Sequence, residues 1–207
     1  MTVELLWNRA SRNSPVLLLA HGAGAPMDSD FMNSMADTLQ QRGVSVARFE
    51  FPYMLKRRQD QRKRPPDRQP VLLQAFAEAA QQAGGAENIF IGGKSMGGRM
   101  ATWLATMQAC RAVVCLGYPF HPPGKPDTLR IEHLADSKAP VLICQGERDP
   151  FGKRDEVSNY TLPSQVSLCW LADGNHDLVP RVRSGLSGQD NIEMAAQRVS
   201  DWIGKYC

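Results

Sequence analysis

Residues 93–97, Gly-Lys-Ser-Met-Gly, form the segment of this sequence whose spacing most clearly suggests chemistry. They have the form G-x-S-x-G, follow an apolar run predicted as a strand over 88–92, and precede a helix predicted over 97–107. A tight strand–turn–helix raises its central serine above a sheet, and the flanking glycines let strand and helix pass without a Cβ collision. We therefore interpret Ser95 as a candidate nucleophile.

A phosphate-binding loop is the competing interpretation of the same residues, because Gly93, Lys94 and Ser95 also end the pattern G-x-x-x-x-G-K-S. That pattern requires a glycine five residues before Gly93. Asn88 stands at this position, so the sequence excludes a phosphate-binding loop.

A serine hydroxyl becomes a good nucleophile only when a base removes its proton, and an imidazole base needs a carboxylate to fix its tautomer. Asp149 follows a strand predicted over 139–146, and His176 follows one predicted over 167–171. The carboxyl ends of parallel strands line one crevice, so we expect Ser95, Asp149 and His176 to converge there. The flanking residues Glu147, Asp173 and Asp177 remain alternatives to Asp149 as the orienting acid.

Short apolar runs alternate with longer amphipathic ones along the chain, a rhythm typical of βαβ units around a parallel sheet. We predict one domain over residues 1–207: a three-layer α/β fold with a mostly parallel sheet of about seven strands and a minimal lid. The predicted strands cover 3–7, 15–20, 44–49, 88–92, 112–117, 139–146 and 167–171, and the predicted helices cover 29–43, 71–85, 97–107, 129–135 and 191–206.

The composition favours a globular protein, since 43% of the 207 residues are hydrophobic and 22% are charged. No apolar run approaches membrane-helix length, and residues 1–20 lack a basic region before an apolar stretch, so we expect a cytoplasmic protein. The five cysteines are odd in number and lack C-x-x-C spacing. We expect them to be reduced, with no disulfide framework, zinc site, other metal or cofactor.

The basic residues are concentrated between Lys56 and Arg68, where seven Lys/Arg and two Asp give +5 in a chain of net charge +3. This segment, expected as a loop, has no aromatic residue for base stacking, so nucleic acid is not an expected partner. Together with Lys94 it could attract an anionic acyl substrate or a polyanion. A solvated loop without a ligand is the alternative.

The residues named so far resemble a compact α/β-hydrolase, and the resemblance covers nearly the whole chain. The segments LLLAHGAGAPMDSDFM, GGKSMGGRMA, GYPFHPPGKPDTLR and GERDPFG resemble in particular a small-hydrolase branch shared with testis-expressed protein thirty and subunit three of the chromatin-associated NSL complex. The resemblance implies an oxyanion hole formed by the amides of Met96 and Ala23, with Gly24 as the alternative to Ala23. The chromatin member implies that this fold also serves as an interaction scaffold.

Other side chains have more than one interpretation. We expect His21 to hold the oxyanion loop through a hydrogen bond. His121 either reaches the crevice and touches substrate or packs in its loop, and His133 is expected on the surface of a short helix. Met27, Met54 and Phe120 form either an apolar wall of the site or part of the core.

These observations lead to two functional hypotheses. The first is a serine hydrolase acting on an ester, thioester or other activated acyl group of a small molecule, without metal or cofactor. The alternative is a non-catalytic interaction module that keeps the fold. Neither a membrane nor nucleic acid is an expected partner, and the sequence indicates no particular protein partner.

Overall fold

A sheet of seven strands runs through the molecule in the computed structural model, which describes residues 3–207. The strand order is β1-β3-β2-β4-β5-β6-β7. Only β1 is antiparallel to its neighbour, β3, so the predicted mostly parallel seven-stranded sheet is confirmed. The strands are β1 (Leu6–Asn8), β2 (Val16–Ala20), β3 (Ser45–Phe49), β4 (Phe90–Lys94), β5 (Val113–Leu116), β6 (Val141–Gly146) and β7 (Val166–Leu171).

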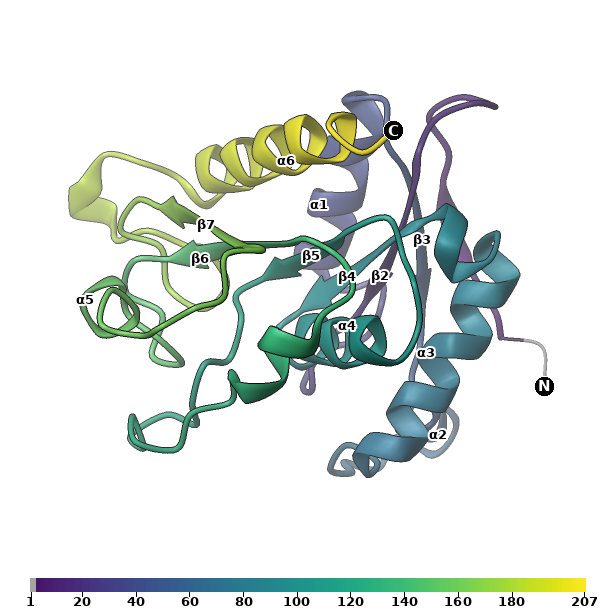
Figure 1. Ribbon diagram of the computed structural model, residues 1–207, viewed down its shortest axis with the longest axis horizontal. Helices are drawn as coiled ribbons and strands as arrows, with labels where there is room; N and C mark the ends of the chain where they lie inside the picture. The colour runs from purple at the N-terminus through teal and green to yellow at the C-terminus, as the bar shows by residue number, and fades with distance from the viewer. Residues whose placement is uncertain (1–2) are drawn as a thin grey trace.

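Helices cover both faces of the sheet and complete the predicted three layers (Figure 1). α1 and α6 pack together on one face, while α3 and α4 pack together on the other, with α2 beside α3. No helix within residues 3–207 has both the length and the apolar character needed to cross a bilayer. The helices are α1 (Asp30–Gln41), α2 (Pro52–Asp60), α3 (Gln69–Ala83), α4 (Met96–Met107), α5 (Arg154–Val157) and α6 (Gly188–Gly204).

The residues of β2 pack against the helix layers on both faces of the sheet. Leu17 and Leu19 pack among the side chains of α1 and α6, whereas Leu18 and Ala20 pack among those of α3 and α4. Side chains alternate between the two faces of a strand, and all four of these are completely buried. A strand covered on both faces has an unbroken apolar run, which is why this strand is recognisable in the sequence.

The order of the strands creates a crevice at the carboxyl edge of the sheet. β3 lies on one side of β2, and the chain then crosses to add β4 on the other side. Loops that follow β2 and β4 diverge at such a reversal, which leaves room for a ligand. Residues 21–25 follow β2 and Ser95 follows β4, so both lie at this reversal.

The basic segment 56–68 differs from the expected loop. α2 extends to Asp60, so only residues 61–68 form a loop. Pro52 stands in the first turn of α2, where its missing N–H costs nothing, and Tyr53 and Met54 are buried against the core. The charged residues therefore obscured, in the sequence, a helix whose first turn is packed against the core.

His133 is a second correction, because it is buried rather than on the surface. It lies in a short 3₁₀ helix, η2 (Glu132–Asp136), that packs on α4. Its ring stacks on Trp103 with a centroid separation of 4.2 Å, and its Nε2 lies 2.9 Å from Thr102 Oγ1. Burial in this contact lowers the pKa of His133 to about 4.

Candidate active site

Ser95 occupies the tight turn between β4 and α4. Its backbone angles, φ 52° and ψ −115°, lie outside the regions that residues with a Cβ readily adopt. A Cβ on Gly93 would lie 2.6 Å from the Ala20 carbonyl oxygen, and one on Gly97 would lie 2.5 Å from the same atom. Contact with β2 therefore requires both glycines of the G-x-S-x-G segment.

His176 connects Ser95 to Asp149. Its Nε2 lies 2.8 Å from Ser95 Oγ, and its Nδ1 lies 2.8 Å from Asp149 Oδ2. A carboxylate can only accept here, so Nδ1 carries the hydrogen and Nε2 accepts from the serine hydroxyl. The structure thus brings together the three side chains that the sequence singles out, in the arrangement that activates a serine.

Asp149 is completely buried, and each of its oxygens has a fixed partner. Gln145 Nε2 donates to Oδ2 over 2.9 Å, and the Phe151 amide donates to Oδ1 over 2.9 Å. The Phe151 ring also lies against the His176 imidazole, with centroids 4.3 Å apart. The acid and the base are therefore held from several sides before any substrate arrives.

The three alternative acids are engaged elsewhere. Glu147 Oε1 pairs with Arg154 at 2.5 Å, and Asp173 pairs with Arg148 and Arg181. The hydrogen bond from Arg181 lowers the pKa of Asp173, and the Asp173 backbone amide, which donates to Glu147, lowers the pKa of Glu147. Asp177 lies 3.2 Å from Lys94 Nζ. Asp149 alone among these candidates contacts His176 Nδ1.

The loop after β2 faces the serine and is fixed by two aromatic side chains. His21 Nδ1 donates to the Gly22 carbonyl over 2.6 Å, and His21 Nε2 accepts from the Phe51 amide over 3.1 Å. The Tyr53 hydroxyl donates to the Ala23 carbonyl over 3.0 Å. Burial lowers the pKa of His21, which suits the neutral ring that this pair of contacts requires. The expected structural role of His21 is thus seen.

The two expected oxyanion donors are both free to point at a ligand. Met96 opens α4, so its amide has no acceptor within the helix. The Ala23 amide donates to no acceptor within residues 3–207, and the same holds for the amide of Gly24, which stays the alternative to Ala23. Both amides belong to loops that border the serine, and the glycines on either side of Ala23 line the same pocket.

Lys94, the last residue of β4, is buried beside Ser95, with 6% of its surface exposed. Its Nζ donates to the His176 carbonyl over 2.8 Å and lies 3.2 Å from Asp177 Oδ1. The same ammonium lies 5.3 Å from the centre of the Phe31 ring. Burial lowers the pKa of Lys94, and Asp177 opposes this shift. Lys94 therefore links the serine turn to the histidine loop.

A pocket of about 330 Å³ opens beside Ser95 and His176. This volume is within the range of small-molecule sites. An adjoining hollow of about 290 Å³ shares Phe31 and Asp177 with it and continues to Val179 and Ile192. The pocket is lined by Gly22, Ala23, Gly24, Ala25, Ser29, Phe31, Met32, Lys94, Ser95, Phe151, His176 and Asp177.

Several residues considered from the sequence lie outside this lining. His121 is 2% exposed and is held by the Pro122 carbonyl and by Glu156, whose Oε2 is 3.3 Å from Nε2. Met54 and Phe120 are buried in the core beneath α3 and α4, and Met27 is not in the lining either. Phe31, Met32 and Phe151 provide the apolar wall instead.

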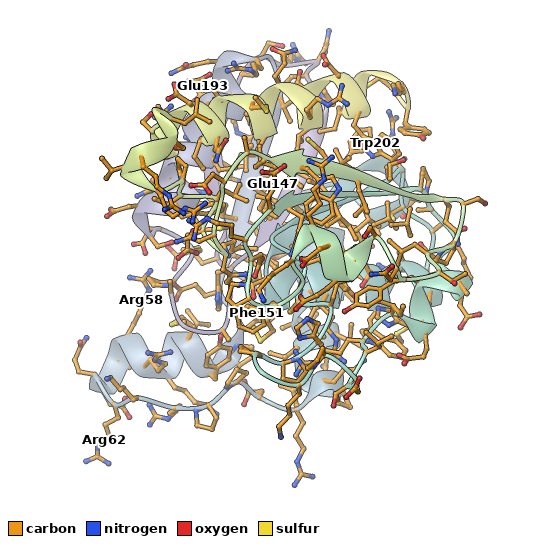
Figure 2. The ribbon with its side chains drawn as sticks, turned by 90° about the vertical axis from the view of Figure 1, so that its left-hand side faces the viewer. Arg58, Arg62, Glu147, Phe151, Glu193 and Trp202 are labelled. Atoms are coloured by element: carbon orange, nitrogen blue, oxygen red, sulfur yellow. The ribbon has the colours of Figure 1, made fainter. Side chains whose placement is uncertain are left out.

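The basic segment also stays out of the pocket. Arg58 pairs with the buried carboxylate of Glu50 at 2.7 Å and with Asp28, while Arg64 pairs with Asp60. Figure 2 shows Arg62 at the outer end of α2, directed away from the rest of the molecule, and Phe151 near the centre of this face. Two of the seven basic side chains of the segment, Arg58 and Arg64, are therefore paired with nearby acids.

Apart from the wall residues Phe31 and Met32, the site residues that the sequence did not reveal are Gln145, Tyr53 and Phe151. Each supports a group of the site rather than reacting with a substrate. Gln145 could have been identified from the sequence, because it lies near the end of the apolar run 139–146 and a buried amide must have hydrogen-bond partners. No pattern marks Tyr53 or Phe151. Within residues 3–207, no cluster of three His, Cys, Asp or Glu side chains is placed to hold a metal ion.

Comparison with known proteins gives a consistent result. A family described as alpha/beta hydrolase domain matches residues 13–204. A dienelactone hydrolase from Anabaena variabilis is 21% identical, with 99% of this chain and 93% of that chain covered and a TM-score of 0.72. Est1E from Butyrivibrio proteoclasticus is 13% identical, covers 100% and 98%, and has a TM-score of 0.70. A monoacylglycerol lipase from Paleococcus ferrophilus is 13% identical, covers 100% of both chains, and has a TM-score of 0.69.

Proposed function

The chain belongs to the alpha/beta hydrolase domain family, and we propose that it is a serine hydrolase that cleaves an ester, thioester or other activated acyl group. The observation that carries this proposal is the hydrogen-bonded series from Ser95 through His176 to Asp149, which opens on a pocket. The strained backbone of Ser95 supports it further, because strain of this kind persists where a function requires it.

The proposed reaction follows from the order of the hydrogen bonds. Ser95 Oγ attacks the substrate carbonyl while His176 Nε2 takes its proton, and Asp149 stabilises the imidazolium. The amides of Met96 and Ala23 bind the oxyanion of the tetrahedral intermediate, a contribution of about 3 kcal/mol for each donor in related sites. His176 then gives its proton to the leaving group. Water, activated by the same imidazole, frees the acyl group from Ser95.

The pocket favours an uncharged acyl group of modest size. Its wall is apolar at Phe31, Met32 and Phe151, and the one cation in its lining, Lys94, already has the His176 carbonyl and Asp177 as partners. The hollow beyond Phe31 gives a second part of the substrate an apolar surface. We include in this proposal membership of the small-hydrolase branch, which does not narrow the range of substrates further.

A series of p-nitrophenyl esters tests this function and its substrate class. We expect the wild-type protein to hydrolyse acetate and butyrate esters faster than a long-chain ester, and neutral acyl groups faster than a succinyl group of similar length. Ser95→Ala should reduce these rates to background, while circular dichroism shows an unchanged fold. Equal hydrolysis by wild type and Ser95→Ala would contradict the proposal. No hydrolysis of any ester by the folded wild type would favour the interaction module.

A further inference from the structure

Two cysteines lie side by side at the far edge of the sheet, away from Ser95. Cys144 on β6 and Cys169 on β7 are direct partners in the parallel register. Both belong to the core cluster beneath α1 and α6, so their side chains project from the same face. Directly paired residues on neighbouring strands are separated by roughly 4.8 Å, which lies within the Cα spacing that a disulfide can bridge.

The two thiols differ in their access to solvent. Cys144 is completely buried, whereas Cys169 is 7% exposed on the edge strand. Cys169 lines a surface hollow of about 260 Å³ between β7 and α6, together with Arg198 and Lys205. A small oxidant can therefore reach Cys169 from the hollow, whereas Cys144 is shielded from solvent.

The charges around the hollow favour a thiolate at its exposed cysteine. A hydrogen bond from the Cys144 thiol and the nearby Arg198 guanidinium lower the pKa of Cys169, against the opposing effect of burial. The same hydrogen bond and complete burial raise the pKa of Cys144. One member of the pair is thus suited to attack and the other to remain protonated until it is needed.

We propose that Cys169 and Cys144 form a peroxide-reactive dithiol, with Cys169 as the attacking residue and Cys144 as the resolving residue. The Cys169 thiolate attacks one oxygen of hydrogen peroxide, which gives a sulfenic acid and a hydroxide ion that becomes water on protonation. The Cys144 sulfur then attacks the sulfenic sulfur, and a second water leaves with the Cys144 proton. Peroxide is reduced, the two thiols are oxidised to a disulfide, and neither step involves Ser95.

The other cysteines provide internal controls. Cys115 lies on the opposite face of the sheet, and burial raises its pKa. Cys110 is partly buried, and burial raises its pKa to about 12. Cys207 is exposed without a neighbouring cysteine in the register. Oxidation that depends only on exposure would reach Cys207 first, whereas the proposed chemistry selects Cys169.

The test is peptide mapping of the reduced, folded protein after treatment with a few equivalents of hydrogen peroxide and rapid alkylation. Trypsin places Cys144 alone in residues 139–148 and Cys169 alone in residues 155–181, so a cross-linked pair is unambiguous. We expect these two peptides to be joined, with a mass lower by two hydrogens, and to separate on reduction. Cys144→Ser should leave a sulfenic acid on Cys169 that dimedone traps. Cys169→Ser should leave Cys144 reduced.

Arg198→Gln tests whether oxidation of Cys169 depends on the Arg198 charge or only on access of peroxide to the hollow. It should slow oxidation of Cys169 several-fold, while Lys138→Gln, a surface change elsewhere, should leave the rate unchanged. The proposal is overturned if Cys169 stays reduced under conditions that oxidise Cys207. It is also overturned if Cys169 is oxidised but no bond to Cys144 forms. Neither result depends on whether the protein is a hydrolase.

Discussion

Two polar regions of this molecule use their charged and hydrogen-bonding groups in opposite ways. At the carboxyl edge, the loops after β2, β4, β6 and β7 hold buried polar side chains that each contact a specific partner and together orient Ser95. The basic segment 56–68 contains more charge but places most of it in solvent, where pairs such as Arg64 with Asp60 form. The proposed active site is therefore distinguished by polar side chains that are buried and have fixed partners, and not by a high density of charge.

Asp149→Asn should produce the largest effect at the carboxyl edge. An amide in this position no longer fixes the tautomer in which His176 Nε2 accepts from Ser95, so we expect kcat/KM to fall about 10⁴-fold. Asp173→Asn is the matched control, since Asp173 pairs with arginines and does not contact His176, and it should change kcat/KM less than about 3-fold. Similar losses of kcat/KM in both variants would show that Asp149 is not the acid that specifically orients His176.

Acid should destabilise the protein through histidines that are buried in the neutral form. His133 titrates near its usual pKa of about 6.5 when unfolded and at about 4 when folded, so below pH 6.5 the unfolded chain binds more protons. The free energy of unfolding should therefore fall as pH drops from 6.5 to about 4, by about 2 kcal/mol after allowance for screening. His21, with a lowered pKa, adds to the same trend.

Urea denaturation at several pH values measures this effect. His133→Gln should flatten the decline between pH 6.5 and 4, although it lowers stability at neutral pH by removing the stack on Trp103. Parallel pH curves for the variant and the wild type would show that His133 does not contribute.

Lys94→Met should reduce turnover more than binding. Methionine keeps the apolar stem but removes the ammonium that joins the His176 carbonyl to Asp177, so the histidine loop loses a fixed contact. We expect kcat to fall about 10- to 100-fold with KM changed less than about 3-fold, as for a residue that positions the base. The exposed Lys153→Met is the control. A rise in KM for succinyl esters alone would instead identify Lys94 as an anion-binding residue.

The basic segment should give the smallest effects on activity. Arg58→Ala removes the partner of the buried Glu50 carboxylate and should lower the free energy of unfolding by about 1–3 kcal/mol. Arg62→Ala, just beyond the outer end of α2, should change the free energy of unfolding by less than about 0.5 kcal/mol. Both variants should hydrolyse neutral esters within about 2-fold of wild type. A selective rise in KM for an anionic ester in Arg62→Ala would restore the basic segment as a substrate-binding region.

The sequence was informative where a local pattern has a physical requirement. The apolar runs of β2 and β6 and the glycines around Ser95 predicted the sheet and the turn, because close contact permits few other residues there. The positions of Asp149 and His176 after two strands predicted their meeting. In the structure, all three side chains lie in one hydrogen-bonded series.

The sequence was uninformative where a contact joins distant segments without a repeated pattern. Tyr53 donates to the Ala23 carbonyl from α2. The sequence did not predict this helix, because its second half is charged and resembles a loop. His133 was expected on the surface, but tertiary packing of η2 on α4 buries it. Such contacts depend on how elements pack, which neither periodicity nor spacing encodes.

Labelling with a fluorophosphonate, which reacts selectively with an activated serine, tests the proposed nucleophile. We expect one adduct per folded chain, located by peptide mass spectrometry on Ser95, and absent from Ser95→Ala. Labelling of Asp149→Asn should be much slower. Ser95 is not the nucleophile if the folded wild-type protein takes up no label or is labelled at another residue.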